Sequence, residues 1–109
     1  VSDICALSTH FPAESFASVF MIEVLEHVER PAEALQQVWE VLQPGGTVVI
    51  SVPYIFEIHD APNDYWRFTE FGLRKLLSNF SQVKIFDNFL TFEILFYTKL
   101  VNMFYMPIR

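Results

Sequence analysis

An eleven-residue segment, HDAPNDYWRFT (residues 59–69), concentrates much of the polar chemistry of the chain in one place. His59 could take a proton from a bound hydroxyl or amine, because an imidazole changes protonation near neutral pH. The neighbouring carboxylate, phenol, indole and guanidinium groups could contact a substrate; they belong to Asp64, Tyr65, Trp66 and Arg67. The segment therefore predicts one side of a substrate pocket.

The same segment also fits a purely structural loop. Asp64 and Arg67 could form an ion pair within the loop. Asp60 could close a turn before Pro62, and Trp66 could cover the core. The two interpretations are compatible, because a rigid loop is what holds contact residues in position. We expect at least one of these side chains to face a pocket, since the loop follows a predicted strand.

A second polar segment, EVLEH (residues 23–27), combines two carboxylates with a histidine. His27 could act as a general base assisted by a neighbouring carboxylate. The alternative is a histidine that hydrogen-bonds the loop and fixes the turn into the next helix. Glu23 directly follows a predicted strand, so we expect it, rather than Glu26, to meet a ligand.

The elements that would position these segments follow from the apolar pattern. Residues 18–24 and 47–53 are nearly continuous apolar runs, which fit strands buried on both faces of a parallel sheet. Between them, a helix is predicted to begin at Pro31 and to stop at the PGG of residues 44–46. Thr69 can cap a second amphipathic helix, which a third, weaker strand over residues 82–89 follows.

The alternation of strands and helices predicts an α/β fold with a mostly parallel sheet and right-handed crossovers. Ligands of open α/β sheets bind beyond the carboxyl ends of the strands. Both polar segments follow a predicted strand, so this rule places them at one edge of the sheet. Residues 88–93, after the last predicted strand, are a third candidate place.

The last segment, residues 91–106, is predicted to form a hydrophobic C-terminal helix. Glu93 and Lys99 would each cost about 2–3 kcal/mol inside a bilayer, which argues against a transmembrane span. We expect a buried or lid-forming helix, with a peripheral membrane contact left open.

Composition limits the functions that remain. The 109 residues suit one small domain or a piece of a larger one, and 52% hydrophobic with 18% charged residues indicates a globular chain. A net charge of -6 without a basic patch argues against nucleic-acid partners. Cys5 is the single cysteine and the three histidines are dispersed, so neither a disulfide nor a zinc pattern is predicted and no metal is expected. The N-terminus lacks a signal-peptide pattern, which predicts a cytoplasmic protein whose beginning is missing here.

Taken together, these motifs resemble the second half of the class I S-adenosylmethionine-dependent methyltransferases. That family shows an acidic residue, an LPF-like segment, SFD opening a strand, EVLEHV, a helix, and LKPGG before another strand. The corresponding pieces here are Asp3, THFPAESFA, EVLEHV and LQPGG. HDAPNDYWRFT is similar to a loop in a bacterial subgroup of the family. The match covers most of residues 1–86, and the order and spacing of the motifs carry it.

The resemblance implies a Rossmann-like methyltransferase fold, with three α/β/α layers, one antiparallel strand in the sheet, and the first strands missing. It implies S-adenosylmethionine as the cofactor. Asp3 would meet the adenine amino group, the amide of Ile4 would face adenine, and Glu23 would lie near the methionine part. The implied reaction is methyl transfer to a small-molecule or lipid-like acceptor, with His59 and then His27 as candidate bases.

Three departures from the family pattern qualify the resemblance. The glycine-rich cofactor loop and the ribose-binding acid would precede Val1, Ala17 replaces the Asp of SFD, and no final antiparallel strand is evident after Phe89. Residues 1–109 are therefore predicted to be the C-terminal portion of a single methyltransferase domain, inactive in isolation. The alternative is a non-catalytic interaction domain that keeps this half of the fold and binds a partner through the aromatic C-terminal helix.

Overall fold

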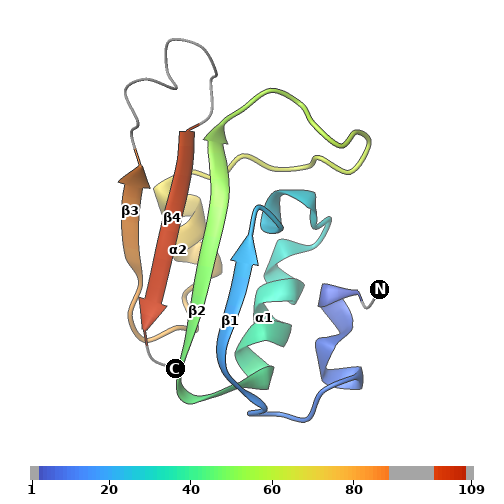
Figure 1. Ribbon diagram of the computed structural model, residues 1–109, viewed down its shortest axis with the longest axis vertical. Helices are drawn as coiled ribbons and strands as arrows, with labels where there is room; N and C mark the ends of the chain where they lie inside the picture. The colour runs from blue at the N-terminus through green and yellow to red at the C-terminus, as the bar shows by residue number, and fades with distance from the viewer. Residues whose placement is uncertain (1–2, 89–99, 108–109) are drawn as a thin grey trace.

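The computed structural model describes residues 3–88 and 100–107, with side chains described for residues 3–86 (Figure 1). In chain order the elements are η1 (Ile4–Thr9), β1 (Phe16–Ile22), η2 (Leu25–His27), α1 (Pro31–Val41), β2 (Leu42–Ile55), α2 (Glu70–Leu76), β3 (Lys84–Asn88) and β4 (Leu100–Pro107).

The four strands form one sheet in the order β1-β2-β4-β3. β1 and β2 are parallel, whereas β4 runs antiparallel to both of its neighbours, β2 and β3. The strands β1, β2 and β3 therefore all point the same way, and their carboxyl ends lie at one edge of the sheet (Figure 1). The predicted α/β order of strands and helices is confirmed.

The predicted C-terminal helix is wrong over residues 100–106, which belong to the strand β4. Residues 91–99 of that prediction lie outside the described residues. A short apolar run fits a helix and a buried strand equally well. What selects the strand is pairing on both sides, with Val48 opposite Met106 and Ile85 opposite Phe104. An antiparallel strand thus follows Phe89 after all.

The core lies between the sheet and one layer of helices. Met21, Val48 and Ile50 point from β1 and β2 into a buried cluster that includes side chains of both α1 and α2. On the other side of β1, Phe20 and Ile22 are 68% and 52% exposed. Within the described residues the sheet therefore carries one of the two helical layers expected. η1 packs against α1, on the side of that helix away from β1 (Figure 1).

Local signals explain how the helices begin and end. Pro31 occupies the first turn of α1, where a missing N–H costs nothing. α1 stops at Val41 rather than at the PGG, and β2 already begins at Leu42. The Thr69 side chain accepts a hydrogen bond from the Gly72 N–H and caps α2 as predicted.

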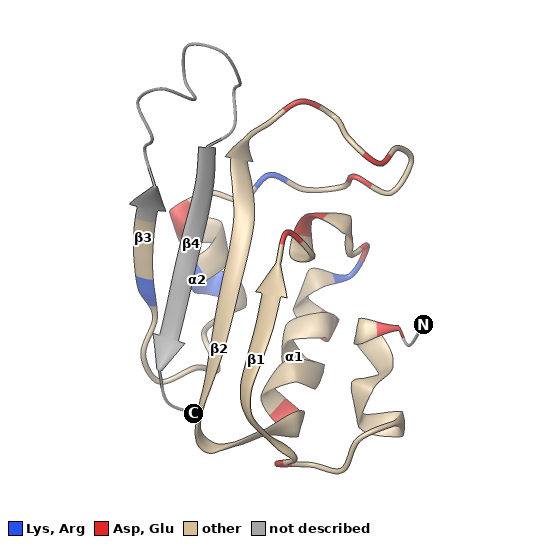
Figure 2. Ribbon diagram, in the orientation of Figure 1, with Lys and Arg blue, Asp and Glu red and all other residues tan. Residues whose placement is uncertain are grey.

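Charged residues lie beyond β1 and β2 rather than within them. These two strands contain no charged residue, whereas acidic groups follow the carboxyl end of each of them (Figure 2). No helix in the part of the chain described here is long and apolar enough to cross a membrane.

Candidate functional site

The segment after β2, residues 56–69, is called the site loop here, and an ion pair within it fixes its shape. The Arg67 guanidinium donates to both carboxylate oxygens of Asp64, at 2.7 and 2.9 Å. It also donates to the backbone carbonyls of Phe56, Glu57 and Trp66. The predicted Asp64–Arg67 pair is thus confirmed. The hydrogen bonds from Arg67 hold the pKa of the Asp64 carboxyl well below its usual range.

The site loop is bound to η2 through backbone groups. The carbonyl oxygen of Glu26 accepts the N–H groups of Tyr65 and Trp66, at 2.9 and 3.2 Å. Nδ1 of His27 lies 2.6 Å from the carbonyl oxygen of Asn63. These contacts join the segments that follow β1 and β2 into one unit at the carboxyl edge of the sheet.

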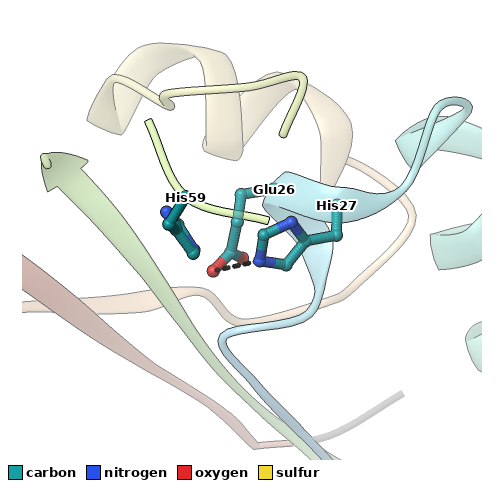
Figure 3. Close-up of side chains that lie close together, drawn as sticks. All are labelled: Glu26, His27 and His59. Atoms are coloured by element: carbon teal, nitrogen blue, oxygen red, sulfur yellow. Dashed lines mark ion pairs between the residues drawn. The ribbon is translucent and has the colours of Figure 1, made fainter. Parts of the chain in front are cut away.

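Three side chains of this unit converge (Figure 3): Glu26, His27 and His59. Glu26 Oε1 is 3.7 Å from Nε2 of His27, and the two imidazole rings meet edge to face at a centroid distance of 4.6 Å. One ligand-type atom from each residue lies within 4.8 Å of the other two. The structure therefore brings together the two histidines that the sequence nominated separately as bases.

Glu26 is the member of this cluster that the sequence reasoning passed over in favour of Glu23. Its side chain is fully buried, and neither carboxylate oxygen has a hydrogen-bond partner among the described residues. Burial raises the pKa of Glu26. The position of Glu26 in the sequence could have indicated this role. Glu26 and His59 each follow the carboxyl end of one of two parallel, adjacent strands, so their side chains can lie close together.

The hydrogen bonds of the two imidazoles assign their tautomers. A carbonyl oxygen only accepts, so Nδ1 of His27 carries the proton that is donated to Asn63. Nδ1 of His59 lies 3.3 Å from the carbonyl oxygen of Glu57 and 3.4 Å from Oδ2 of Asp64, which are also acceptors. In the neutral form of each ring, Nε2 is therefore the nitrogen that carries the lone pair.

Two surface hollows lie on the segments that carry the cluster, and His27 lines the first of them. The first, called the η1–η2 hollow, has a volume of about 300 Å³ and is lined by Asp3, Ile4, Cys5, His27, Val28, Glu29, Arg30 and Tyr65. The second, the loop hollow, has a volume of about 220 Å³ and is lined by Phe56, Ile58, Asp64, Tyr65, Trp66 and Arg67. Tyr65 lines both hollows.

The predicted cofactor residues are divided between two places. Asp3 and Ile4 line the η1–η2 hollow, where Oδ1 of Asp3 also caps η1 by accepting the Cys5 N–H at 2.9 Å. Glu23 lies elsewhere, at the end of β1 with a φ of 53°, and Ser51 Oγ donates to its Oε1. It lines neither hollow, so its contact with a cofactor stays a prediction.

The aromatic residues of the site loop are more exposed than a core-covering role requires. Trp66 is 41% exposed, and its Nε1–H donates to the carbonyl of Val28 at 2.8 Å. Its ring stacks on Phe68, which is the residue that covers the core. Trp66 therefore covers the core only through Phe68, and it also lines the loop hollow, where the sequence placed it as a wall.

Comparisons with known proteins agree with this architecture. Residues 1–50 match the family model described as a methyltransferase domain. No curated protein matches the chain.

Several solved structures share the fold. An S-adenosylmethionine-dependent methyltransferase from Archaeoglobus fulgidus aligns with a TM-score of 0.74 at 14% identity, over 97% of this chain and 65% of that one. Phosphoethanolamine N-methyltransferase 2 of Haemonchus contortus, solved with phosphomonomethylethanolamine and S-adenosylhomocysteine, aligns with a TM-score of 0.73 at 12% identity, over 100% of this chain and 36% of that one. The [4+2]-cyclase SpnF aligns with a TM-score of 0.69 at 12% identity, over 97% of this chain and 53% of that one.

The chain thus spans less than two thirds of the length of these structures. Identities of this size establish architecture and leave the reaction open. The chain has the Rossmann-like fold of the S-adenosylmethionine-dependent methyltransferases, as its motifs predicted, and its first 50 residues match a methyltransferase-domain family.

Proposed function

We propose that this chain forms part of an enzyme that transfers a methyl group from S-adenosylmethionine to a small-molecule or lipid-like acceptor. The observation that carries the proposal is the η1–η2 hollow, because it gathers Asp3 and Ile4 beside His27 and Tyr65. The family match of residues 1–50 supports it independently. The small phosphorylated amine in the Haemonchus contortus structure supports an acceptor of modest size.

The cofactor side of the proposal rests on Asp3 and Ile4. Oδ1 of Asp3 is engaged by the Cys5 N–H, which leaves Oδ2 to accept from an amino group such as that of adenine. A hollow of about 300 Å³ lies at the small end of ligand sites, so it fits one ring system rather than the whole cofactor. Other segments of the complete protein would supply the remaining contacts, in keeping with the partial coverage of the related folds.

The acceptor side of the proposal rests on the site loop. The cofactor supplies a methyl group already activated by a positively charged sulfur. The residues of the chain then have to align the acceptor and remove its proton. The free Nε2 of His59, or of His27, would take that proton. Tyr65 and Trp66 would shape the acceptor pocket, with Asp64 and Arg67 holding the loop around it.

The first test is cofactor binding by the complete protein, measured by isothermal titration with S-adenosylmethionine. Asp3→Ala should weaken binding by about 1–3 kcal/mol, the range for hydrogen bonds to charged groups. It should also lower stability by about 1 kcal/mol, because the η1 cap is lost. Glu70→Ala, on α2 and remote from the hollow, is the matched control with unchanged affinity. An Asp3 variant that binds as tightly as the parent would remove this residue from the site, and a parent that does not bind would refute the proposal.

The second test measures enzymatic turnover by the complete protein, followed as the release of S-adenosylhomocysteine. The candidate acceptors are a panel of amines and alcohols, each with and without an acyl chain. His59→Ala should lower the rate by about 100- to 10,000-fold if this ring takes the proton, with cofactor affinity unchanged. His10→Ala, an exposed histidine beside η1, is the control and should keep full turnover.

A non-catalytic interaction domain is the second candidate. The exposed apolar side of β1, with Phe20 and Ile22, favours it, and the SpnF structure illustrates that one fold hosts different chemistries. A complete protein that folds but binds no S-adenosylmethionine would favour this candidate over methyl transfer.

A further inference from the structure

The Glu26 carboxylate is buried without a hydrogen-bond donor among the described residues, and its ion-pair contact is His27 Nε2, at 3.7 Å. Both oxygens are inaccessible, and neither accepts a hydrogen bond from the described residues. A buried ionised carboxylate is stable only when it is paired, hydrogen-bonded or bound to a metal. Arg67, the nearby cation, is already committed to Asp64 through two hydrogen bonds.

The groups that surround this carboxylate are acceptors as well. The tautomers assigned above place the ring protons of His27 and His59 on Nδ1, where backbone carbonyls accept them. One carboxylate and two imidazoles therefore share a space in which one ligand-type atom of each residue lies within 4.8 Å of the other two. Three acceptors without a donor between them form a site suited to a cation.

We propose that Glu26, His27 and His59 bind a divalent transition-metal ion of the zinc class. Two imidazole nitrogens and a carboxylate oxygen are ligands that zinc, iron and their neighbours accept. Zinc bonds of about 2.0–2.2 Å place neighbouring ligand atoms about 3.3 Å apart. The 3.7 Å between Glu26 Oε1 and His27 Nε2 is already close to that separation. A movement of the His59 side chain toward Glu26 and His27 would complete the set.

The surroundings of the two rings match those of metal-bound histidines. Such ligands typically donate their second ring N–H to a carbonyl or carboxylate, which fixes the ring and makes the ligating nitrogen more basic. Asn63 performs this role for His27, and Glu57 together with Asp64 does so for His59. The Asp64–Arg67 pair and the Glu26 backbone hydrogen bonds hold the site loop that carries these acceptors.

A site with three protein ligands leaves at least one coordination position for another molecule. His27 also lines the η1–η2 hollow, so that position would open toward it. An oxygen or nitrogen of the methyl acceptor could bind there, a step that rests on the proposed function, whereas metal binding itself does not. In the metal-loaded protein the two histidines hold the ion and do not take the acceptor proton.

The test uses the complete protein after treatment with a chelator and its removal, without S-adenosylmethionine. Titration with zinc should show one ion per chain. Cobalt(II), used as a spectroscopic probe, should give visible absorption bands that zinc then abolishes. Glu26→Gln and His59→Ala should each lower zinc affinity by more than tenfold. The matched controls, Glu33→Gln and His10→Ala, change exposed residues of the same types and should bind as the parent does.

Circular dichroism and thermal unfolding show whether each variant is folded. If Glu26→Gln does not fold, the zinc affinity of His59→Ala tests the site instead. This variant is expected to fold, because the His59 side chain is 27% exposed and lies outside the core. Zinc binding that is absent, that exceeds one ion per chain, or that is equal in parent and His59→Ala would overturn the metal site. Because no cofactor is present, these outcomes are independent of whether the protein transfers methyl groups.

Discussion

Asp64 illustrates why a polar residue in a site loop has more than one use. Its side chain is 2% exposed, and its two oxygens accept hydrogen bonds from the Arg67 guanidinium and the His59 backbone N–H. The sequence showed that Asp64 and Arg67 could pair, but residue types alone could not tell whether the pair faced a ligand. The geometry favours a role in positioning the loop, which leaves His59 and Tyr65 to face a ligand.

Asp64→Asn should therefore destabilise the protein in a pH-dependent way. The pKa of Asp64 is lower in the folded state, so the pair contributes stability at pH values above the unfolded pKa of about 3.9 and loses it as the pH falls below that value. Breaking a buried pair costs about 3 kcal/mol at pH 7. Urea unfolding at pH 7 and at pH 3 should show the gap between parent and variant narrowing at the lower pH.

Asp60→Asn, at an exposed position of the same loop, is the control and should leave stability nearly unchanged. A gap between parent and Asp64→Asn that is equal at both pH values would show that the lost charge is not what matters.

At the scale of elements, the sequence predicted what is local and missed what is long-range. Pro31 and Thr69 act within a few residues, and the starts of the two helices were predicted correctly. The apolar stretch that contains β4 carries no local feature that separates strand from helix, because its state depends on pairing with β2 and β3. The candidate site shows the same division between local features, which were predicted, and long-range contacts, which were not. The polar segments were visible, but the convergence of His27 and His59 depends on the parallel pairing of β1 and β2.

The junction between α1 and β2 offers a test of one close backbone approach. A Cβ on Gly46 would lie 2.8 Å from the carbonyl oxygen of Gln43 and 2.9 Å from Cδ2 of Leu42. Gly46→Ala should therefore cost about 1–3 kcal/mol of stability, because backbone and core must shift to make room.

Gly72→Ala is the matched control, because this glycine lies in α2 and its added Cβ would approach only the Thr69 hydroxyl, at 3.3 Å. It should be neutral or stabilising by about 0.5–1 kcal/mol, since alanine favours the helix. Chemical denaturation of both variants gives the comparison, and an equally stable Gly46→Ala protein would contradict the tight packing.

At the scale of the whole molecule, the described residues form a sheet with helices on one face. β1 separates the two faces residue by residue, since Met21 is 2% exposed and its neighbour Phe20 is 68% exposed. The sequence predicted a strand buried on both sides, because its apolar run did not alternate. Within the described residues, helices pack only against the face that carries Met21.

Alanine substitutions at these two neighbours should separate the faces. Met21→Ala should cost about 2–5 kcal/mol, because it leaves a cavity in the core. Phe20→Ala should stay within about 0.5 kcal/mol of the parent if its face is open to solvent, as expected for surface positions. Thermal unfolding of the complete protein measures both. A loss at Phe20 as large as that at Met21 would mean that this face is covered rather than open to solvent.

Glu26 contacts both the histidines of the cluster and the backbone of the site loop. Its carboxylate faces the two imidazoles, while its peptide carbonyl, a few bonds away, holds the amides of Tyr65 and Trp66. A ligand that immobilises the carboxylate also steadies the carbonyl, and the two amide protons then become slower to exchange with solvent. The hydrogen-exchange rates of these two amides therefore report whether a ligand occupies the site beside Glu26, even when the ligand has not been identified.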